Sequence, residues 1–388
     1  MFIAGEASGD VLGAELIAAL RARLTARDPQ FFGVGGPQMQ AAGMDLLFDF
    51  ARNAVFGLEA LKRISEFRKQ FKWLLKIAIE RQPDVIVCID FAGFNRRFAE
   101  HVKDYSRRGG SPEWNPKIVQ YVSPQVWASR PGRADKLARD IDLLLAIFPF
   151  EQEWYQKRTP ALRVEFIGHP MVDRYAGQVR HEEHAAANSP VIVFLPGSRA
   201  SELKRHLPVM RDVRTRIAAE FPGARAIMVL SDRLVEMARR LGLPSEFHVR
   251  PNLAHELSQA DLAIAKSGTV TLECAFFRVP TVALYKTSLA TYLIAKRIVK
   301  VKWIAMPNIL ANEEVFPEFI QGEATAENIA RAALELLRDT VRRNTIKRKL
   351  DAIAGALGEP GAARRAAEKI LGLLEMQSAA PSVGSSKA

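Results

Sequence analysis

The sequence predicts an α/β protein of two Rossmann-like lobes, each a doubly wound parallel sheet, with a cleft between them and a helical segment at the C-terminal end. Short apolar runs alternate with segments of helical period in both halves, which is typical of parallel sheets covered by helices. A polar stretch without periodicity, 174–190, separates the halves. The 388 residues, of which 48% are hydrophobic, are sufficient for two cores.

The apolar runs give the order of the predicted strands. In the first half they cover 2–4, 31–34, 84–90, 117–123, 142–148 and 164–167, and the first helix covers 11–24. In the second half strands begin at Val191, Arg225, Leu262 and Thr281. The segment 325–374 is helical throughout, with a break near 355–361. We expect lobes at 1–175 and 188–340, helices at 341–375 whose packing on the first lobe stays open, and a disordered Ser/Ala/Pro/Gly-rich tail at 376–388.

The composition narrows the class of partner and the compartment. The 55 Lys and Arg against 43 Asp and Glu give a formal charge of +12, which favours nucleic acid, anionic lipid or phosphorylated substrates. Cys88 and Cys274 have no CxxC partner, so we expect reduced core residues in a cytosolic protein. We find neither a signal peptide nor an apolar run of the roughly 18 residues that span a bilayer, and expect a soluble or peripheral protein.

Two segments combine basic and apolar side chains. The segment 62–81 holds seven Lys or Arg against two Glu, with aromatic residues between the charges. Such a helix suits a membrane surface, and it equally suits an amphipathic helix that packs its apolar side on a sheet. The stretch 294–303 has the same two interpretations. Both remain open at the level of the sequence.

A pair of turns in the second half carries the strongest chemical signal. The apolar run 191–195 leads into a Gly-Ser turn and an Arg at the start of a helical segment, and the run 262–265 leads into a similar turn. Backbone N–H groups at such turns, together with a guanidinium, form a site for a phosphate dianion. The residues expected there are Gly197, Ser198, Arg199, Ser267, Gly268 and Thr269.

A different turn, GEASGD at 5–10, follows the first predicted strand. Its glycines, Gly9 among them, allow close backbone approach, whereas Ser8 and Asp10 are either helix caps or ligand contacts. Glu6 has no capping role at this spacing and is a candidate site residue. The later turn GVGGP at 33–37 is not a GxGxxG fingerprint, which argues against a dinucleotide cofactor.

Further candidates follow the strands 84–90 and 117–123. Asp90 ends a buried run, where a carboxylate facing a cleft is a natural general base, although it could instead cap the following loop. Ser123 and Trp127 lie in a Ser-Pro turn that forms either an acceptor wall or an ordinary turn. Asp140-Ile-Asp142 looks like a metal-binding DxD motif, but it precedes its strand, at the wrong end for a site.

Two polar residues follow the second phosphate turn. Glu273 lies four residues beyond Thr269, on the same helical face, where a carboxylate could accept hydrogen bonds from two ribose hydroxyl groups or be a surface charge. Asn308 follows a Pro and is either a turn residue or an amide donor to substrate.

Taken together, these motifs resemble the lipid A disaccharide synthase family, bacterial glycosyltransferases of the two-lobed B-type fold (GT-B). The resemblance covers residues 4 to about 321. It is carried by AGEASGD at 4–10, GVGGPQMQAAG at 33–43, ID and FN at 89–95, YVSPQVWASRPGR at 121–133, FPFE at 148–151, GHP at 168–170, LPGSR at 195–199, SGTVTLE at 267–273 and MPNILA at 306–311. So many motifs in this order are highly specific.

The resemblance implies a reaction and roles for the candidates. UDP-2,3-diacylglucosamine would be joined to the 6-hydroxyl of 2,3-diacylglucosamine 1-phosphate, with inversion, to give the β-1,6 disaccharide and UDP. Asp90 would be the base or position the acceptor, with Glu6 beside it. Arg199 and the helix start at 267–269 would stabilise the charge on UDP, so neither a metal nor a cofactor is implied. Glu273 would hold the ribose, and Asn308 would lie near the donor.

The acylated substrates imply a peripheral protein at the cytoplasmic face of the inner membrane, with no nucleic-acid partner; a homo-oligomer stays open. The sequence departs from the family at VWAS (126–129), at Ala92-Gly93 and at 309–314, where an Arg is lost. These departures bear on acyl-chain preference. The alternatives are a UDP-N-acetylglucosamine 2-epimerase, another B-type glycosyltransferase with a soluble acceptor, and a two-lobed binding protein without turnover.

Overall fold

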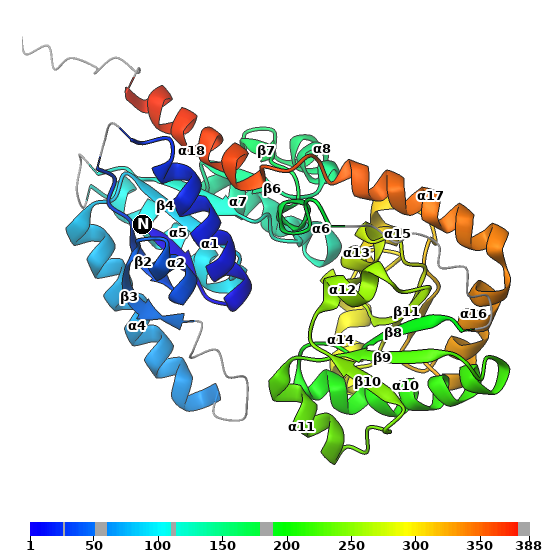
Figure 1. Cartoon of the computed structure of the whole chain (residues 1–388). Helices are drawn as coiled ribbons and strands as arrows, with labels where there is room; N and C mark the ends of the chain where they lie inside the picture. The colour runs from blue at the N-terminus through cyan, green and yellow to red at the C-terminus, as the bar shows by residue number, and fades with distance from the viewer. Residues whose placement is uncertain (26–27, 51–59, 110–113, 179–188, 379–388) are drawn as a thin grey trace, which may run out of the picture. The chain divides into compact units, whose positions relative to one another are not determined.

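The structure is a computed structural model that describes residues 1–25, 28–50, 60–109, 114–178 and 189–378, without the side chains of 60–67 and 376–378. The chain forms two compact units (Figure 1). Unit 1 contains Met1–Arg174 and Leu357–Ala388, and unit 2 contains Tyr175–Ala356. The predicted linker and tail lie largely outside the described residues.

Unit 1 is built on a seven-stranded, fully parallel sheet with the strand order β3-β2-β1-β4-β5-β6-β7. Its strands are β1 (Phe2–Ala4), β2 (Phe32–Gly35), β3 (Asp45–Asp49), β4 (Val85–Ile89), β5 (Lys117–Tyr121), β6 (Leu143–Ala146) and β7 (Val164–Phe166). Its helices are α1 (Ala7–Arg21), α2 (Pro37–Ala41), α4 (Ala60–Arg81), α5 (Ala92–Arg107), α6 (Val126–Ser129), the 3₁₀ turn η1 (Pro131–Arg133), α7 (Ala134–Asp140), α8 (Pro149–Arg158), α9 (Pro170–Arg174) and α18 (Ala362–Ser378).

Unit 2 is built on a six-stranded parallel sheet with the strand order β10-β9-β8-β11-β12-β13. Its strands are β8 (Val191–Leu195), β9 (Arg225–Val229), β10 (Phe247–Arg250), β11 (Leu262–Lys266), β12 (Thr281–Tyr285) and β13 (Glu318–Ile320). Its helices are α10 (Ala200–Glu220), α11 (Asp232–Arg240), α12 (Leu253–Ser258), α13 (Thr269–Phe276), α14 (Leu289–Ile298), α15 (Met306–Ala311), α16 (Ala326–Arg338) and α17 (Thr340–Ala356).

The two sheets share one topology, which locates a candidate site in each unit. In both sheets the first strand lies in the middle. The second and third strands follow it toward one edge of the sheet, and the later strands lie in order toward the other edge. The strand order therefore reverses between β1 and β4 in unit 1 and between β8 and β11 in unit 2. Ligands of open α/β sheets bind at such a switch point, outside the carboxyl ends of the strands.

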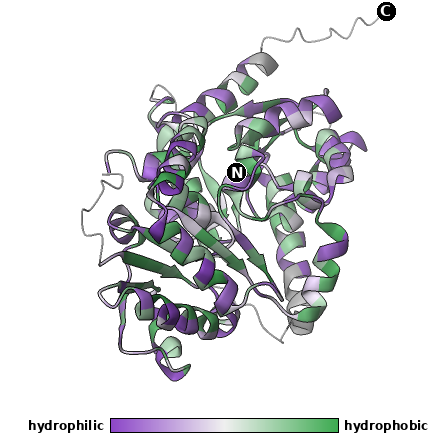
Figure 2. Cartoon of the chain, turned by 90° about the vertical axis from the view of Figure 1, so that its right-hand side faces the viewer, coloured by the Kyte–Doolittle hydropathy of each residue, from purple (hydrophilic) through white to green (hydrophobic). Residues whose placement is uncertain are grey.

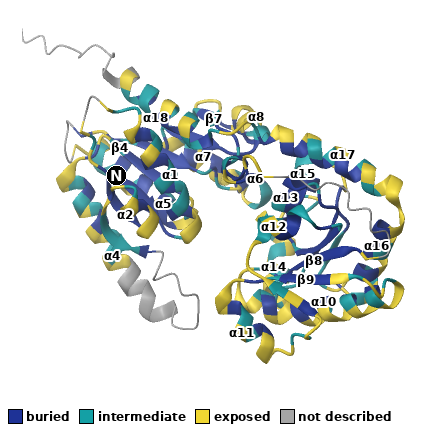
Figure 3. Ribbon diagram, viewed as in Figure 1, coloured by how far each residue is buried: buried dark blue, intermediate teal, exposed yellow. Residues whose placement is uncertain are grey.

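The central strands form the cores of the two units. All residues of β1, β6 and β8 are buried, and Figure 3 shows β8 and β9 mostly in dark blue. Near-continuous apolar runs are typical of parallel strands that are covered on both faces. In Figure 2 strands are green, whereas the surrounding helices alternate between purple and green. The predicted fold of two parallel sheets covered by helices is confirmed.

The structure adds elements that the apolar runs did not predict. The strands β3, β10 and β13 are all edge strands, and most of their residues are only partly buried or exposed. Because one side of an edge strand faces solvent, its sequence lacks a continuous apolar run. The predicted helical segment 325–374 is also interrupted at Asp339, which caps α17 by accepting a 2.8 Å hydrogen bond from the Arg342 N–H.

The C-terminal helices divide between the units. α17 packs on α13 and α15 in unit 2, whereas α18 packs on α1 in unit 1. Asp173 anchors the start of α18, because its carboxylate accepts hydrogen bonds from the N–H groups of Gly361 and Ala362. No helix in the described ranges combines the length and the apolar character needed to cross a bilayer.

Candidate active site

Asp90 is the first residue after β4, at the switch point of unit 1. Its backbone N–H donates to Tyr121 O at 2.8 Å, and its φ angle is 46°, followed by 44° at Phe91. Two successive non-glycine residues in the left-handed region are uncommon and typical of functional loops. Although the side chain reaches solvent, partial desolvation raises the pKa of the Asp90 carboxyl, against a smaller effect of the Phe91 N–H. A raised pKa makes this carboxylate a stronger base.

Asn95 holds this loop in place. Its Nδ2 donates to Asp90 O at 2.9 Å, to Ile89 O at 3.2 Å and to Ile3 O at 3.4 Å. The side chain is fully buried, and it ties the ends of β1 and β4 together. The sequence indicates Asn95 only as part of the FN motif and does not predict this supporting role. Its position five residues after Asp90, one helical turn into the next segment, is the signal that could have indicated it.

The turn after β1 lies directly beside the Asp90 loop. Ala4 pairs with Ile89 in the sheet, and a Cβ added to Gly5 would lie 2.5 Å from the Phe91 ring. Only glycine therefore fits at position 5. Glu6 is the N-cap residue of α1 but makes no side-chain cap, and Ser8 is exposed in the first turn. The structure thus brings the Glu6 and Asp90 loops together, with Gly9 buried behind them.

Asp10 does not cap its own helix. Its carboxylate is buried and accepts hydrogen bonds of 2.9–3.0 Å from the N–H groups of Gly36, Gln38 and Met39. These amides form the start of α2, so Asp10 satisfies donors that the helix leaves unpaired. Of the two roles that the sequence leaves open for Asp10, a cap of its own helix and a ligand contact, the cap is not formed, because the carboxylate accepts from the turn after β2 instead.

Ser123 and Trp127 belong to a buried polar cluster rather than to an open wall. Trp127 Nε1 donates to Glu151 Oε1 at 3.0 Å, and Ser123 also hydrogen-bonds to Glu151. Both side chains are less than 10% exposed, and Glu151 is fully buried. Burial raises the pKa of Glu151 to about 7, against the smaller effects of these donors. The cluster therefore fixes the turn that carries Ser123 and Trp127, and their contact with substrate stays a prediction.

The first phosphate-type turn of unit 2 is already occupied by a carboxylate of the same chain. Glu202 Oε2 accepts hydrogen bonds from Ser198 N at 3.1 Å and from Arg199 N at 3.3 Å. Gly197 has a φ of +110°, and an added Cβ would collide with the same carboxylate oxygen. The Arg199 guanidinium is 64% exposed and lies 3.7 Å from Glu202 Oε1. The N–H groups of the turn thus bind a carboxylate, that of Glu202, and the phosphate site stays a prediction.

Lys266 connects this turn to the second one. Its Nζ lies 3.3 Å from Glu202 Oε1, and it is the last residue of β11, directly before Ser267 and Gly268. Ser267 is buried, and Thr269 is exposed at the start of α13. The switch point of unit 2 therefore combines the amides of two turns with two cations, Arg199 and Lys266. Lys266 was missed, although its position at the strand end was a visible signal.

His206 fixes the position of the first turn. Its Nδ1 lies 2.7 Å from Pro196 O, and its Nε2 accepts from the Lys286 N–H at 3.0 Å. Burial lowers the pKa of the imidazole, which is therefore neutral and donates through Nδ1. The buried ring thus links the exits of β8 and β12.

The two remaining candidates have partners inside unit 2. Glu273 accepts a 2.7 Å hydrogen bond from the Tyr175 hydroxyl through Oε1. Asn308 is fully buried, donates to Phe316 O and Glu318 Oε1, and accepts from the N–H groups of Val315 and Phe316, at 2.8–2.9 Å. With two donated and two accepted hydrogen bonds, the side-chain amide of Asn308 has a partner for each of its N–H groups and for both lone pairs of its oxygen. Asn308 therefore holds the loop before β13, which agrees with the turn role that the sequence leaves open for it; a role next to the donor stays a prediction.

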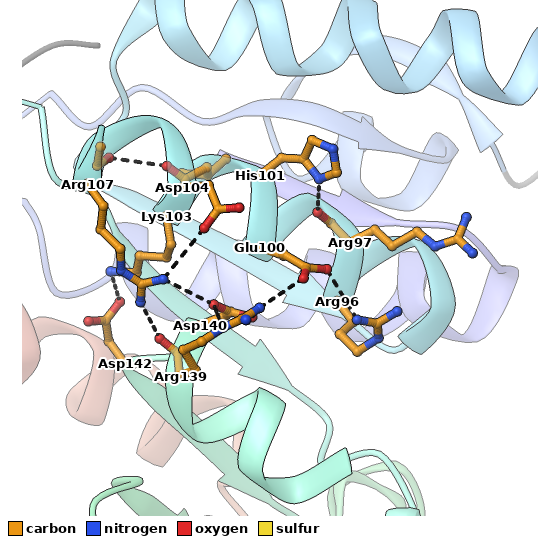
Figure 4. A network of polar contacts seen from close by, with 12 residues as sticks. Arg96, Arg97, Glu100, His101, Lys103, Asp104, Arg107, Arg139, Asp140 and Asp142 are labelled. Atoms are coloured by element: carbon orange, nitrogen blue, oxygen red, sulfur yellow. Dashed lines mark hydrogen bonds and ion pairs between the residues drawn. The ribbon is translucent and has the colours of Figure 1, made fainter. Parts of the chain in front are cut away.

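The DxD-like residues of unit 1 lie at the amino end of β6 in a network of ion pairs (Figure 4). Asp142 Oδ2 lies 2.7 Å from Lys103 Nζ, and Asp140 is paired with Arg139 at 2.7 Å and with Arg107 at 3.5 Å. A cavity of about 390 Å³ adjoins these residues. The basic side chains that line the cavity, Lys103, Arg107 and Arg139, are ion-paired with Asp142 and Asp140. The network therefore stabilises the packing of α5 on α7. Within the described residues no group of three or more acidic, His or Cys side chains could hold a metal ion.

Comparison with solved structures identifies the fold. The chain is similar to UDP-GlcNAc 2-epimerase from Neisseria meningitidis (TM-score 0.55, 12% identity, covering 92% of this chain and 96% of that one). It is also similar to MurG of Acinetobacter baumannii (TM-score 0.52, 14% identity, covering 96% and 99%). These likenesses concern the fold alone, and because they extend to the calicheamicin glycosyltransferase CalG4 (TM-score 0.58, 15% identity), the fold does not separate an epimerase from a glycosyltransferase.

Sequence comparison makes that distinction. The family model of lipid-A-disaccharide synthetase matches residues 1–369. The lipid-A-disaccharide synthase of Myxococcus xanthus is 36% identical over 388 residues, covering 96% of this chain and 97% of the relative. These matches confirm the family that the ordered motifs indicate. The chain belongs to the lipid-A-disaccharide synthase family of glycosyltransferases.

Proposed function

We propose that this protein transfers the diacylglucosamine group of UDP-2,3-diacylglucosamine to the 6-hydroxyl of 2,3-diacylglucosamine 1-phosphate. The products are the β-1,6-linked disaccharide 1-phosphate of lipid A and UDP. Family membership supports the reaction, and the observation that carries the assignment of roles is the shared sheet topology. One switch point holds a carboxylate with a raised pKa, and the other holds two amide turns with two cations.

In the proposed mechanism, Asp90 takes the proton of the acceptor 6-hydroxyl. The oxygen forms a bond to C1 of the donor sugar while the bond from C1 to the diphosphate oxygen breaks, and its electron pair leaves with UDP. A single displacement inverts the anomeric configuration, so one base is sufficient. Glu6, on the loop beside Asp90, orients the acceptor, and Asn95 fixes the backbone that carries the base.

Unit 2 stabilises the negative charge that develops on UDP. Backbone amides at 197–199 and at the start of α13 are preorganised donors, and Arg199 and Lys266 add two positive charges. Glu273 holds the ribose hydroxyl groups, in addition to its bond with Tyr175. These groups perform the charge stabilisation without a metal or a cofactor. Since both substrates are acylated, the enzyme works at the cytoplasmic face of the inner membrane.

The direct test supplies both acylated substrates in mixed detergent micelles and measures released UDP together with the tetraacyl disaccharide 1-phosphate. We expect a product whose new linkage is β, as seen in its anomeric NMR signal. Production of UDP without disaccharide, or epimerisation of UDP-N-acetylglucosamine as the main activity, would refute the proposal. Asp90→Ala serves as the inactive control, and Asp135→Ala, exposed on α7, as its matched surface control.

A further inference from the structure

The helix α14 of unit 2 exposes an unusual apolar surface. In the part of the chain that the structure describes, seven large hydrophobic side chains are strongly exposed, and four of them lie within 289–299. These four are Leu289 (66% exposed), Leu293 (53%), Ile294 (60%) and Val299 (40%). No residue of α14 is buried. Grouped exposed apolar residues mark an interaction surface, whereas single ones are ordinary.

The helix presents this surface because it contacts unit 2 through its other side. Tyr292, Ala295 and Ile298, spaced by three residues, are half-buried and form the attached side. Leu289 and Leu293, spaced by four, lie on the free side, and Arg297 continues that row. An ordinary amphipathic helix buries its largest apolar residues. Here they are exposed, so unit 2 itself supplies no partner for them.

Basic side chains extend the apolar surface. Lys296, Arg297, Lys300 and Lys302 are exposed, and none of them is ion-paired within the described residues. The sequence contains no Asp or Glu from position 274 to position 312. Elsewhere on the same unit, several exposed basic residues have acidic partners, as Arg240 has Glu236 at 3.1 Å. We define the α14 surface as these four basic residues together with Leu289, Leu293, Ile294 and Val299.

The α14 surface begins at the edge of the sheet that carries the candidate UDP site. β12 pairs with β11 in parallel, so α14 leaves the same carboxyl edge as the turn at Ser267–Thr269. His206 ties the backbone of Lys286, two residues before the N-cap of α14, to Pro196 in the first turn. A lipid surface bound by α14 would therefore lie on the side of unit 2 where a diphosphate enters.

We propose that the α14 surface docks on an anionic lipid bilayer, with the leucine and isoleucine side chains in the acyl boundary and the four cations at the headgroups. Apolar residues beside unpaired cations fit such an interface. A second copy of the chain fits it poorly, because a two-fold dimer through α14 would bring two sets of four positive charges together without an acidic residue. The proposal deepens the proposed function, since it names the surface by which unit 2 reaches acylated substrates.

The test measures co-sedimentation of the full chain, without substrates, with phosphatidylglycerol/phosphatidylethanolamine vesicles and with neutral phosphatidylcholine vesicles. We expect wild-type protein to prefer the anionic vesicles. The variants Lys296→Glu/Arg297→Glu and Leu293→Ser/Ile294→Ser should each lower the partition coefficient about tenfold or more. The matched control, Arg233→Glu/Arg239→Glu on α11, makes the same charge change on an exposed face of unit 2 and should change binding by less than twofold.

Three results would overturn the proposal: no preference of the wild type for anionic vesicles, equal loss of binding in the α11 control, or binding that depends on Arg68, Lys69 and Lys72 of α4 and not on α14. Dimerisation that disappears in the α14 variants, without vesicle binding, would assign the surface to a second copy instead. Circular dichroism checks that each variant is folded. Failure of the turnover assay with vesicle binding intact would refute the proposed function alone.

Discussion

The Nζ atom of Lys266 lies 3.3 Å from Oε1 of Glu202, and this ion pair joins the two phosphate-type turns of unit 2. The other carboxylate oxygen of Glu202 accepts from the Ser198 and Arg199 amides. Glu202 therefore occupies the donors that a diphosphate would use. The pair balances the charges at the ends of two neighbouring strands, and in the proposed function the carboxylate would have to release these donors for UDP to bind.

Replacing Glu202 with Gln should tighten UDP binding about tenfold, because it removes a negative charge from the anion site while an amide oxygen can still accept from the turn. Isothermal titration calorimetry with UDP measures the effect. Glu236→Gln, on the exposed side of α11, is the control and should leave the affinity unchanged. Weaker UDP binding in Glu202→Gln would mean that the carboxylate supports the site instead of competing for it.

Arg199→Ala should lower kcat/KM about 10²–10³-fold, the usual loss when one charged donor to a developing anion is removed. The melting temperature should stay within a degree or two of wild type, because the side chain is largely exposed and its 3.7 Å ion pair is weak. Arg199→Lys should restore part of the activity, since it returns the charge without the guanidinium fork. A large fall in melting temperature would show that the residue is structural.

Asp90→Asn should lower kcat/KM about 10²–10⁴-fold, the range expected when a general base is lost. The base must be deprotonated to act, so wild-type activity falls as the pH falls through the pKa of Asp90. Because that pKa is raised, the acidic limb of the pH–rate profile should lie above the ordinary range of an aspartate. The limb should persist in Glu6→Gln. Its loss in Glu6→Gln and persistence in Asp90→Asn would exchange the two roles.

The buried Glu151 predicts a pH-dependent stability of unit 1. Its pKa is raised from 4.5 to about 7 by burial, so the folded state holds a proton that the unfolded state releases between these values. The resulting stabilisation is fully present below pH 4.5 and is lost as the pH rises through about 7, by on the order of 3 kcal/mol at most. Urea unfolding at several pH values should show a smaller decline in Glu151→Gln. If the free energy of unfolding depended on pH in Glu151→Gln as it does in the wild type, this assignment would be contradicted.

The sequence alone determined those parts of the architecture that depend on patterns within short segments. Apolar runs of strand length followed by Gly-rich turns are encoded over 5–10 residues, and they located Asp90 and Arg199 at strand ends. Edge strands such as β10 were missed, because a half-exposed strand has no continuous apolar run. The ordered motifs also indicated the family, and the match over residues 1–369 confirmed it.

Only the tertiary structure decided the partners of the polar residues. Asp10 accepts hydrogen bonds from amides 26–29 residues away, and the side-chain amide of Asn308 is hydrogen-bonded to the loop before β13. Glu202 and Lys266 are 64 residues apart in the sequence, and they meet because β8 and β11 are neighbours in the sheet. Buried polar groups bind whichever donors the strand order brings near, and strand order is a property of the packed sheet rather than of any short segment.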